Sequence, residues 1–299
     1  MARSTLIRVV GLVRYRFFLY AGLLPYLLGA AWAYRITGQL DGPVFWSGLG
    51  GVALAVVGVE AFNEYFDSRA GTDRVFNPDD PPPMSDAILW LGIMAFVGAL
   101  AIGMYLTARA GWPVLAFAVF GGLAAVFYVA PPIRWAYRGM GEMIIALSYG
   151  PSMVLGSLYL QARLLAWGAF WASLVPGFLI MALAVANAIP DFHQDRLVGK
   201  RNLVVRLGRE RGVWLYLALA SAALLVTVTG VAAGLFPKGC LAALLAAPLI
   251  VSSGRCAFGT FNTPRLFAPA IQRIVACYVV AVAAFSAAVA LQAWLGAGA

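Results

Sequence analysis

Oxygen-bearing side chains gather at one place early in a chain in which only 11% of the residues are charged. The stretch VEAFNEYFDSRAGTDR contains Glu60, Asn63, Glu64, Asp67 and Asp73. Positions three and four apart lie on one face of an α-helix, so the members from Glu60 to Asp67 are predicted to share a face over two turns. Carboxylate and amide oxygens that converge in this way are suited to binding a hard cation.

A second cluster has the same chemistry and the same order. The stretch NAIPDFHQDRLVGKRN places Asn187, Asp191 and Asp195 at intervals of four residues, again on one helical face. An Asn is followed four residues later by an Asp in this cluster, as Asn63 is followed by Asp67 in the first. The alternative is that both clusters are solvated helix ends neutralised by neighbouring arginines. The repeated order favours a shared binding role.

These clusters require positive charge to offset them. An acidic residue inside a membrane span costs about 2.5–3.5 kcal/mol, and two carboxylates about 4 Å apart repel by about 4 kcal/mol at an effective dielectric constant of about 20. Because the ligands are oxygens without His or Cys, Mg²⁺ is favoured over Ca²⁺ or a transition metal. The predicted metal ligands are Asn63, Glu64, Asp67, Asp73, Asn187, Asp191 and Asp195.

A magnesium ion held by few carboxylates implies a phosphorylated ligand, because Mg²⁺ commonly joins protein carboxylates to phosphate oxygens. Basic residues stand beside both clusters and between them in sequence: Arg69, Arg74, Arg134, Arg138, Arg196, Lys200 and Arg201. The chain contains no GxxxxGK[ST] motif and no GxGxxG motif that opens a helix after a strand. A nucleotide held in a glycine-rich loop is therefore not expected.

The elements that position these residues are predicted to be membrane helices. The chain has 299 residues, of which 63% are hydrophobic, and a mean hydropathy of +0.86. This composition excludes an ordinary soluble domain, a disordered chain and a disulfide scaffold. Cys240, Cys256 and Cys277 lie in separate apolar stretches without CxxC spacing, so we expect core residues and no metal or redox pair.

Nine apolar segments predict an all-α, multi-pass integral membrane protein that forms one transmembrane domain over residues 1–299. The breaks at Pro25, Gly150-Pro151 and Pro176-Gly177 predict kinked or tilted helices, and the first segment is expected to be an uncleaved helix. The predicted spans lie near residues 17–37, 44–63, 87–107, 113–130, 142–160, 168–190, 213–235, 239–253 and 274–295.

The distribution of basic residues predicts the orientation of the chain. With nine spans, 17 of the 21 basic residues fall on the side of the N-terminus, and the other side keeps Arg35, Arg109, Arg163 and Lys238. By the positive-inside rule, the N-terminus and both acidic clusters face the cytoplasm, as expected for a protein of the inner (plasma) membrane. The net charge of +9 is explained without a nucleic-acid partner.

The motifs resemble those of the UbiA superfamily of intramembrane prenyltransferases, in which an NDxxD-type motif and a DxxxD motif lie on cytoplasmic helix ends. Here they read NEYFDSRAGTD (63–73) and NAIPDFHQD (187–195). The chain most resembles the 1,4-dihydroxy-2-naphthoate polyprenyltransferases of menaquinone synthesis, through GTD after the first motif, YVAPPIRWAYRGMGE (128–142), GPSMVLGSLYL (150–160) and GKRNLVVRLG (199–208). The specific motifs cover about residues 14–210.

Three positions depart from the pattern of the relatives. Glu64 replaces the usual Asp, and Asn202 stands where Thr is common. Arg14-Tyr15-Arg16 replaces an Arg-Pro near the first helix, close to where relatives hold the acceptor or its headgroup. Glu64 still supplies a carboxylate, so the metal chemistry is expected to survive.

The resemblance implies a bundle around a central cavity, with an apolar groove open to membrane lipid for a prenyl tail. It implies that Asn63, Asp67, Asp191 and Asp195 hold Mg²⁺ against the diphosphate of a polyprenyl donor. The catalytic set would be Asp67, Asp191, Asp195 and Lys200, and the diphosphate-binding set Arg69, Tyr128, Arg138, Lys200 and Arg201. A small aromatic acceptor, expected to be 1,4-dihydroxy-2-naphthoate with loss of its carboxyl group, would attack the allylic cation. Aromatic faces such as Phe62, Tyr65 or Phe66 would assist.

Alternatives remain open at this stage. A transporter also uses acidic residues near helix breaks, but it places them near the bilayer midplane rather than at helix ends. Within the enzyme class, the acceptor could instead be a hydroxybenzoate, homogentisate, a porphyrin or a polar lipid headgroup. His193 lies between Asp191 and Asp195 and is a minor candidate for a general base. The loop around Pro81–Pro83 is a candidate lid.

Overall fold

The computed structural model describes residues 16–70 and 84–297, and within these ranges the regular elements are all helical. The longer helices are α2 (Arg16–Thr37), α3 (Gly42–Ala70), α4 (Asp86–Ala110), α5 (Pro113–Val129), α6 (Gly141–Leu147), α7 (Met153–Ala162), α8 (Trp167–Ala188), α11 (Arg209–Ala232), α12 (Ala247–Thr260) and α13 (Pro264–Ala297). Short elements are η3 (Trp135–Tyr137), η4 (Ser148–Ser152), α9 (Phe192–Leu197), α10 (Leu203–Leu207) and η5 (Lys238–Ala246). The predicted all-α fold is confirmed.

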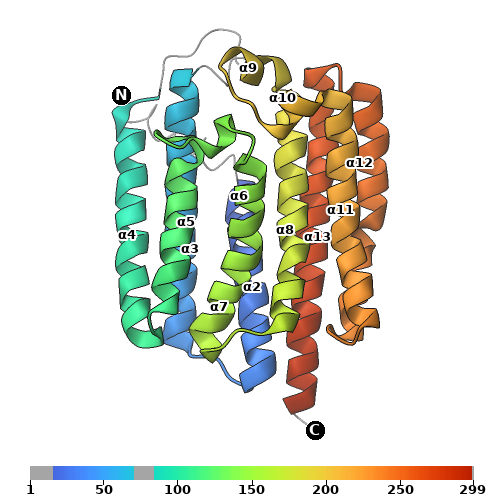
Figure 1. Ribbon diagram of the computed structural model, residues 1–299. Coiled ribbons are helices and arrows are strands. Elements are labelled where there is room, and N and C mark those ends of the chain that lie inside the picture. The colour runs from blue at the N-terminus through green and yellow to red at the C-terminus, as the bar shows by residue number, and fades with distance from the viewer. Residues whose placement is uncertain (1–15, 71–83, 298–299) are drawn as a thin grey trace, which may run out of the picture.

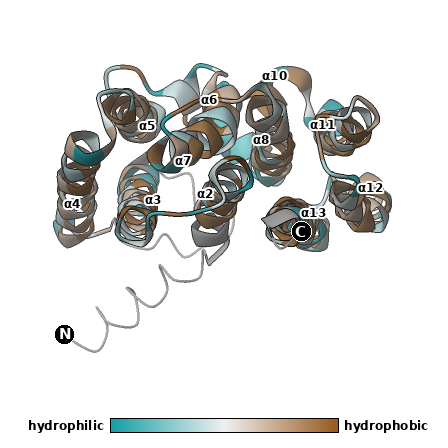
Figure 2. Ribbon diagram, turned by 90° about the horizontal axis from the view of Figure 1, so that it is seen from below, coloured by the Kyte–Doolittle hydropathy of each residue, from teal (hydrophilic) through white to brown (hydrophobic). Residues whose placement is uncertain are grey.

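The long helices run side by side, and the short helices α9 and α10 lie across one end of the bundle (Figure 1). We call this the motif end, because α3, with the described part of the first motif, ends there, and the second motif leads into α9 there. Along the helix axes, α3, α4 and α5 gather on one side and α11, α12 and α13 on the other, with α2, α6, α7 and α8 between them (Figure 2). Each motif is therefore carried at the end of a membrane-type helix.

Seven helical segments of the described chain are long and apolar enough to cross a membrane. Each of the nine predicted segments overlaps a helix, but the count of nine spans is not confirmed. Helix α5, with 17 residues, is shorter than the roughly 20 residues that a straight span needs. The short elements α9 and α10 were included in no predicted segment, because they follow the end of α8 rather than an apolar stretch.

Helix α8 forms the centre of the hydrophobic core. Val175, Leu179, Ile180 and Leu183 are at most 2% exposed, and α8 packs against α2, α6, α11 and α13. Outward positions carry large apolar side chains such as Trp46, which is 68% exposed. Extensive exposure of apolar side chains around a bundle is typical of surfaces that meet lipid.

The predicted break at Gly150-Pro151 is present. The apolar run from 141 to 162 forms α6, then the π-helical turn η4 that contains Pro151, then α7. A Cβ atom on Gly150 would stand 2.8 Å from Gly177 Cα and 2.8 Å from the Ser173 carbonyl oxygen of α8. The absence of side chains at both glycines therefore lets η4 approach the backbone of α8 closely, as small residues do in membrane helix pairs.

Three of the four basic residues predicted on the far side, Arg35, Arg109 and Arg163, lie at the end opposite the motif end. Arg109 Nη2 lies 3.8 Å from Asp41 Oδ2, and Arg163 Nη2 donates a hydrogen bond to the Arg109 carbonyl oxygen at 3.1 Å. Arg35 Nη1 donates to Gln292 Oε1 at 3.2 Å. The two ends of the bundle therefore carry separate sets of charged side chains.

Candidate active site

The structure brings Asp67 and Asp195, one from each motif, together around one lysine. The ammonium nitrogen of Lys200 lies 3.0 Å from Asp67 Oδ1 and 3.7 Å from Asp195 Oδ1. The side chains of Lys200 and Asp195 are only 12% and 7% exposed. Helix α3 and the segment around α9 are thus joined at the motif end by a half-buried ion triad.

Asp195 is held in place by Asn202. The Asn202 side-chain amide donates a hydrogen bond to Asp195 Oδ2 at 2.6 Å, and its carbonyl oxygen accepts from the Val205 backbone N–H at 2.8 Å, which caps α10. The Lys200 backbone N–H also donates to the Asp195 carbonyl oxygen at 2.8 Å. Asn202 therefore fixes both the start of α10 and the orientation of the Asp195 carboxylate.

The loop between α5 and α6 and the first turn of α6 are hydrogen-bonded to the segment that contains α10. The buried carboxylate of Glu142 accepts a hydrogen bond from the Leu203 backbone N–H at 2.9 Å. Arg206 donates to the carbonyl oxygens of Arg138 and Arg201 at 2.6 and 2.8 Å. Gly139 has a φ of +74°, and a Cβ there would stand 2.5 Å from Arg206 Nε. Residues 138–142 are thereby fastened to the chain that follows the second motif.

The pKa values at the motif end follow from burial and from the ion triad. Burial alone would lower the pKa of Lys200, but the carboxylates of Asp67 and Asp195 outweigh it and raise that pKa above its ordinary value. Burial raises the pKa of Asp195, although Lys200 and Asn202 favour its ionised form. Burial also raises the pKa of Tyr137, whose ring lies 5.7 Å from the Lys200 ammonium. Lys200 therefore carries a positive charge at neutral pH.

The donor set at this end fits a magnesium ion shared with a phosphate ligand. Among the described residues, no group of three His, Cys, Asp or Glu side chains forms a complete metal cage. Asn63 Oδ1 is buried without a hydrogen-bond partner, one helical turn before Asp67. Mg²⁺ needs only one or two protein carboxylates when phosphate oxygens and waters complete its octahedron. Asn63, Asp67 and Asp195 are consistent with that requirement.

The remaining predicted metal ligands occupy different places. Asp73 lies outside the described residues, and Glu64 lies one residue after Asn63 on α3. Asn187 lies in the last turn of α8. Asp191 lies at the start of α9, where its carbonyl oxygen accepts a hydrogen bond from the Asp195 backbone N–H at 2.8 Å. Their metal-binding roles stay predictions.

The predicted diphosphate-binding residues are distributed unequally. Arg69 turns to the start of α4, where Nη2 lies 2.8 Å from Asp86 Oδ1 and its guanidinium stacks 3.7 Å above the Tyr65 ring. Arg138 and Arg201 are exposed at the motif end. Tyr128, at the end of α5, lies within electrostatic range of Lys200, Asp67 and Asp195. Tyr128, Arg138 and Arg201 are therefore better placed than Arg69 to meet a ligand beside Lys200.

Two further predicted candidates make aromatic contacts. His193 is exposed on α9, with its ring 5.2 Å from that of Phe192. Phe62 is buried in the contact between α3 and α4, where its ring lies 5.1 Å from Phe96. This contact is structural, and a role of Phe62 toward an allylic cation stays a prediction.

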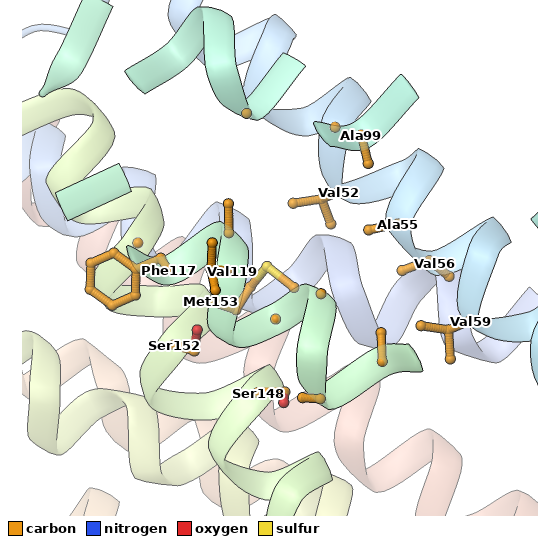
Figure 3. Close-up of a pocket in the computed structure, with 18 of the residues that line it drawn as sticks. Val52, Ala55, Val56, Val59, Ala99, Phe117, Val119, Ser148, Ser152 and Met153 are labelled. Atoms are coloured by element: carbon orange, nitrogen blue, oxygen red, sulfur yellow. The ribbon is translucent and has the colours of Figure 1, made fainter. Parts of the chain in front are cut away.

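A cavity of about 640 Å³ extends from the motif end along α3, between α4, α5 and α7. Asn63 and Tyr128 line it near the triad, whereas Tyr26 and Leu160 line it near the opposite end. Figure 3 shows Val52, Val56 and Val59 on the side formed by α3. The lining is predominantly apolar, so this space suits a long hydrocarbon group.

The cavity has exposed lips on α4 and α5. Leu100, Val119 and Leu123 line the cavity and are 54%, 47% and 52% exposed. In a membrane these side chains would face lipid. Such a cavity is open sideways to the bilayer.

Comparison with known proteins identifies the family. The UbiA prenyltransferase family matches residues 22–259. The chain belongs to this family. It is 30% identical over 220 residues to a protein from Mycobacterium tuberculosis named 1,4-dihydroxy-2-naphthoate octaprenyltransferase, over 70% of this chain and 74% of the relative.

Solved structures support the same fold. A UbiA homologue from Aeropyrum pernix in its apo form aligns with a TM-score of 0.66 at 16% identity, over 89% of this chain and 96% of that one. A UbiA homologue from Archaeoglobus fulgidus bound to DMAPP and Mg²⁺ aligns with a TM-score of 0.57 at 18% identity, over 94% and 98% of the two chains. The UbiA fold inferred from the motifs is confirmed.

In this UbiA prenyltransferase, two functionally placed residues were not recognised from the sequence. Asn202 was noted only as a departure from Thr, although it caps α10 and orients Asp195. Glu142 lies in a stretch that resembles the relatives, and its sequence position predicts no role, although its carboxylate accepts a hydrogen bond from the Leu203 backbone N–H. The Asn202-Leu203-Val204-Val205 run is a recognisable capping signal. The contact between positions 142 and 203 has no signal in a single sequence.

Proposed function

We propose that this chain transfers a prenyl group from an allylic polyprenyl diphosphate to a hydroxylated aromatic acceptor, with 1,4-dihydroxy-2-naphthoate as the first acceptor to test. One observation carries the proposal: the Lys200 ion triad lies at one end of a long apolar cavity that opens toward lipid. A prenyl diphosphate has the same division, with a charged head and an apolar tail. The name of the mycobacterial relative supports the naphthoate acceptor.

The residues at the motif end would bind the head of the donor. Asn63, Asp67 and Asp195 would hold Mg²⁺, which supplies Lewis-acid stabilisation of the leaving diphosphate when bound. Mg²⁺ and prenyl diphosphates are present in structures of the archaeal homologues. Lys200 would stabilise the negative charge that grows on the diphosphate as the allylic C–O bond breaks. The exposed guanidinium groups of Arg138 and Arg201 would complete the charge balance.

The second half of the reaction would take place in the cavity. The diphosphate leaves with the bonding electron pair, and a ring carbon of the acceptor attacks the allylic cation to form a C–C bond. The ring regains aromaticity by losing a proton or, with the naphthoate, its carboxyl group as CO₂. Apolar side chains such as Val56 and Val59 keep water from the cation, and others such as Phe117, near the start of α5, hold the prenyl tail.

We also propose that the motif end faces the cytoplasm of an inner-membrane protein. The described chain keeps exposed Arg138, Arg196, Arg201 and Arg206 at this end. An excess of Lys and Arg marks cytoplasmic loops. Water-soluble acceptor and released diphosphate would then exchange with the cytoplasm.

The proposed function is tested by incubating the purified protein with Mg²⁺, geranylgeranyl diphosphate and 1,4-dihydroxy-2-naphthoate, with products identified by mass spectrometry. We expect a prenylated, decarboxylated naphthoquinol and an equal amount of diphosphate, both abolished by EDTA and restored by Mg²⁺. Parallel reactions with 4-hydroxybenzoate, homogentisate, a porphyrin and phosphatidylglycerol test the other acceptors. Absence of a prenylated product from every acceptor would contradict the proposal.

A further inference from the structure

The π-helical turn η4 has one side against α8 and the other toward the cavity. Gly150, at its centre, packs so closely on α8 that a Cβ there would meet backbone atoms of Gly177 and Ser173 at 2.8 Å. Residues two before and two after a helical position lie roughly half a turn away from it. Ser148 and Ser152 therefore face away from α8, and both line the cavity. Turns of this type are frequent at functional sites in helices.

Figure 3 shows Ser148 and Ser152 across the cavity from the α3 side chains Val56 and Val59. The hydroxyl oxygen of Ser148 is buried and has no hydrogen-bond partner. Asn63 Oδ1, which lines the same cavity, is also buried without a partner. Buried polar atoms are normally hydrogen-bonded, so these two mark a place where a ligand supplies the missing partner.

Two other polar side chains on the cavity wall, Tyr26 and Ser157, are hydrogen-bonded within the protein. Tyr26 donates its hydroxyl to the Phe45 carbonyl oxygen at 2.8 Å, and Ser157 donates to the Tyr26 carbonyl oxygen at 2.6 Å. Both lie toward the end of the cavity opposite the triad. The two buried oxygens without a partner, Asn63 Oδ1 and Ser148 Oγ, therefore differ from the hydrogen-bonded hydroxyls of Tyr26 and Ser157.

The position of Ser148 selects one class of ligand. It lies six residues beyond Glu142, which places it about 9 Å deeper along the helix axis. The charged head of a prenyl diphosphate belongs with Lys200, and a prenyl tail has no hydrogen-bonding group. A neutral hydroxyl or carbonyl on a flat ring is the chemistry that an apolar wall with two serine hydroxyls would recognise.

We propose that Ser148 and Ser152 bind the ring hydroxyl groups of the aromatic acceptor, and that η4 is the acceptor subsite. This inference rests on the proposed prenyl transfer and adds the place where the acceptor lies. The ring would lie between η4 and α3, farther from the motif end than Asn63, with its hydroxyl groups toward the two serines. The diphosphate head of the donor would then lie at the motif end, and the acceptor ring would lie deeper in the same cavity.

The test compares Ser148→Ala with the unmodified protein, using 1,4-dihydroxy-2-naphthoate as substrate. We expect KM for the acceptor to rise about tenfold, which is the value of one neutral hydrogen bond, while KM for geranylgeranyl diphosphate stays unchanged. Ser148→Thr, which keeps a hydroxyl, should recover part of the loss. Ser286→Ala is the matched control, because that buried serine lies on α13 and bonds its own helix at the Val282 carbonyl oxygen.

Two inhibitors locate the contact. The inhibition constants of 1-hydroxy-2-naphthoate and 4-hydroxy-2-naphthoate, each of which lacks one ring hydroxyl, are measured for the unmodified protein and for Ser148→Ala. Ser148→Ala should weaken the analogue that keeps the contacted hydroxyl about tenfold, and should leave the other unchanged. A merely structural effect of the substitution would weaken both analogues equally.

The outcomes separate this inference from the proposed function. If the unmodified protein prenylates the naphthoate and Ser148→Ala leaves acceptor KM and both inhibition constants unchanged, the η4 subsite is wrong and the prenyl transfer stands. An equal loss for both analogues, or a rise in donor KM, also overturns the subsite. If the unmodified protein prenylates no aromatic acceptor, the proposed function itself fails.

Discussion

Lys200 connects the two acidic motifs through a single ammonium group. Its contacts with Asp67 and Asp195 engage oxygens that would also bind magnesium. The Lys200 ammonium group and a divalent cation therefore compete for the same carboxylate oxygens. When no metal is bound, the positive charge of Lys200 offsets the repulsion between the two carboxylates. When the carboxylates bind a metal ion, Lys200 is released to bind a phosphate group.

Replacing Lys200 should have opposite effects on metal and donor. Lys200→Gln removes a competitor for Asp67 and Asp195, so we expect Mg²⁺ to bind the donor-free protein several-fold more tightly. The same variant should bind geranylgeranyl diphosphate more weakly, because charge-assisted contacts to phosphate are lost. Isothermal titration calorimetry measures both affinities. Arg201→Gln, at an exposed position, is the control and should change donor affinity alone.

Asn202 offers a second test at this scale. Asn202→Ala removes the cap of α10 and the amide that orients Asp195, and we expect it to lower the free energy of unfolding by about 1 kcal/mol. Asn202→Thr keeps a capping oxygen but loses the amide donor, so it should retain stability and still reduce Mg²⁺ affinity. Thermal unfolding in detergent and metal titration distinguish the two effects. Unchanged Mg²⁺ affinity in Asn202→Thr would show that Asn202 acts only as a cap.

The residues with chemistry were easier to predict than the residues that hold them. The cost of negative charge in an apolar chain pointed to Asp67 and Asp195, the need for a positive partner and the family resemblance pointed to Lys200, and the structure places the three together. Glu142 could not be assigned in this way, because its partner at Leu203 is an ordinary backbone N–H far along the chain. Arg69 was grouped with its neighbours in sequence, whereas its side chain turns to Asp86 on another helix.

At the scale of elements, the close contact between η4 and α8 sets one wall of the cavity. Gly150 and Gly177 bring the two backbones together, and their neighbours Ser148 and Ser152 then face the cavity. The apolar segment 142–160 predicted one helix, and Gly150-Pro151 predicted its kink. The π-helical geometry could not be predicted, because it depends on how η4 packs on α8.

The contact at Gly150 predicts a large difference between two glycine substitutions. Gly150→Ala places a methyl group 2.8 Å from backbone atoms of α8 that cannot rotate away, so we expect a loss of stability of about 1–3 kcal/mol from overpacking. Gly50→Ala, on α3 with nothing within 4 Å of the new Cβ, should be neutral or stabilising by up to about 1 kcal/mol. Thermal unfolding of both variants under the same detergent conditions measures the difference. A stable Gly150→Ala protein would contradict the close approach.

At the scale of the whole molecule, charged groups are separated between the two ends of the bundle. The motif end has the ion triad and exposed arginines, whereas the opposite end has Asp41, Arg109 and Arg163 in mutual contact. Composition was sufficient to predict helices across a membrane. The number of spans was not, because the predicted segments at α2 and α5 are not among the seven helical segments of the described chain that are long and apolar enough to cross a membrane.

This separation predicts which end reagents reach from outside the cell. In a variant without its native cysteines, Leu197→Cys at the exposed motif end should resist a membrane-impermeant maleimide in intact cells. Gln39→Cys, exposed at the opposite end, should react. Both should react after the membrane is permeabilised, which controls for accessibility. The reverse pattern in intact cells would place the motif end outside.

The cavity also predicts a dependence on donor length. Gly122 lines it and has nothing within 4 Å of a new Cβ, so Gly122→Leu would place a branched side chain in the space proposed for the tail. We expect KM for a long donor such as a C40 prenyl diphosphate to rise more than KM for geranyl diphosphate. Steady-state kinetics with both donors measures the ratio. Equal changes would mean that the tail follows another path.

The exposed lips Leu100, Val119 and Leu123 have a consequence for how the donor partitions. A long-chain donor would be dissolved in the bilayer before it meets the protein, and lipid tails are as apolar as the side chains of the cavity. Moving the tail sideways between these two environments changes its solvation free energy very little. Selectivity for the donor would then depend on the few polar contacts of its head, and occupancy would follow the mole fraction of donor in the lipid rather than its concentration in water.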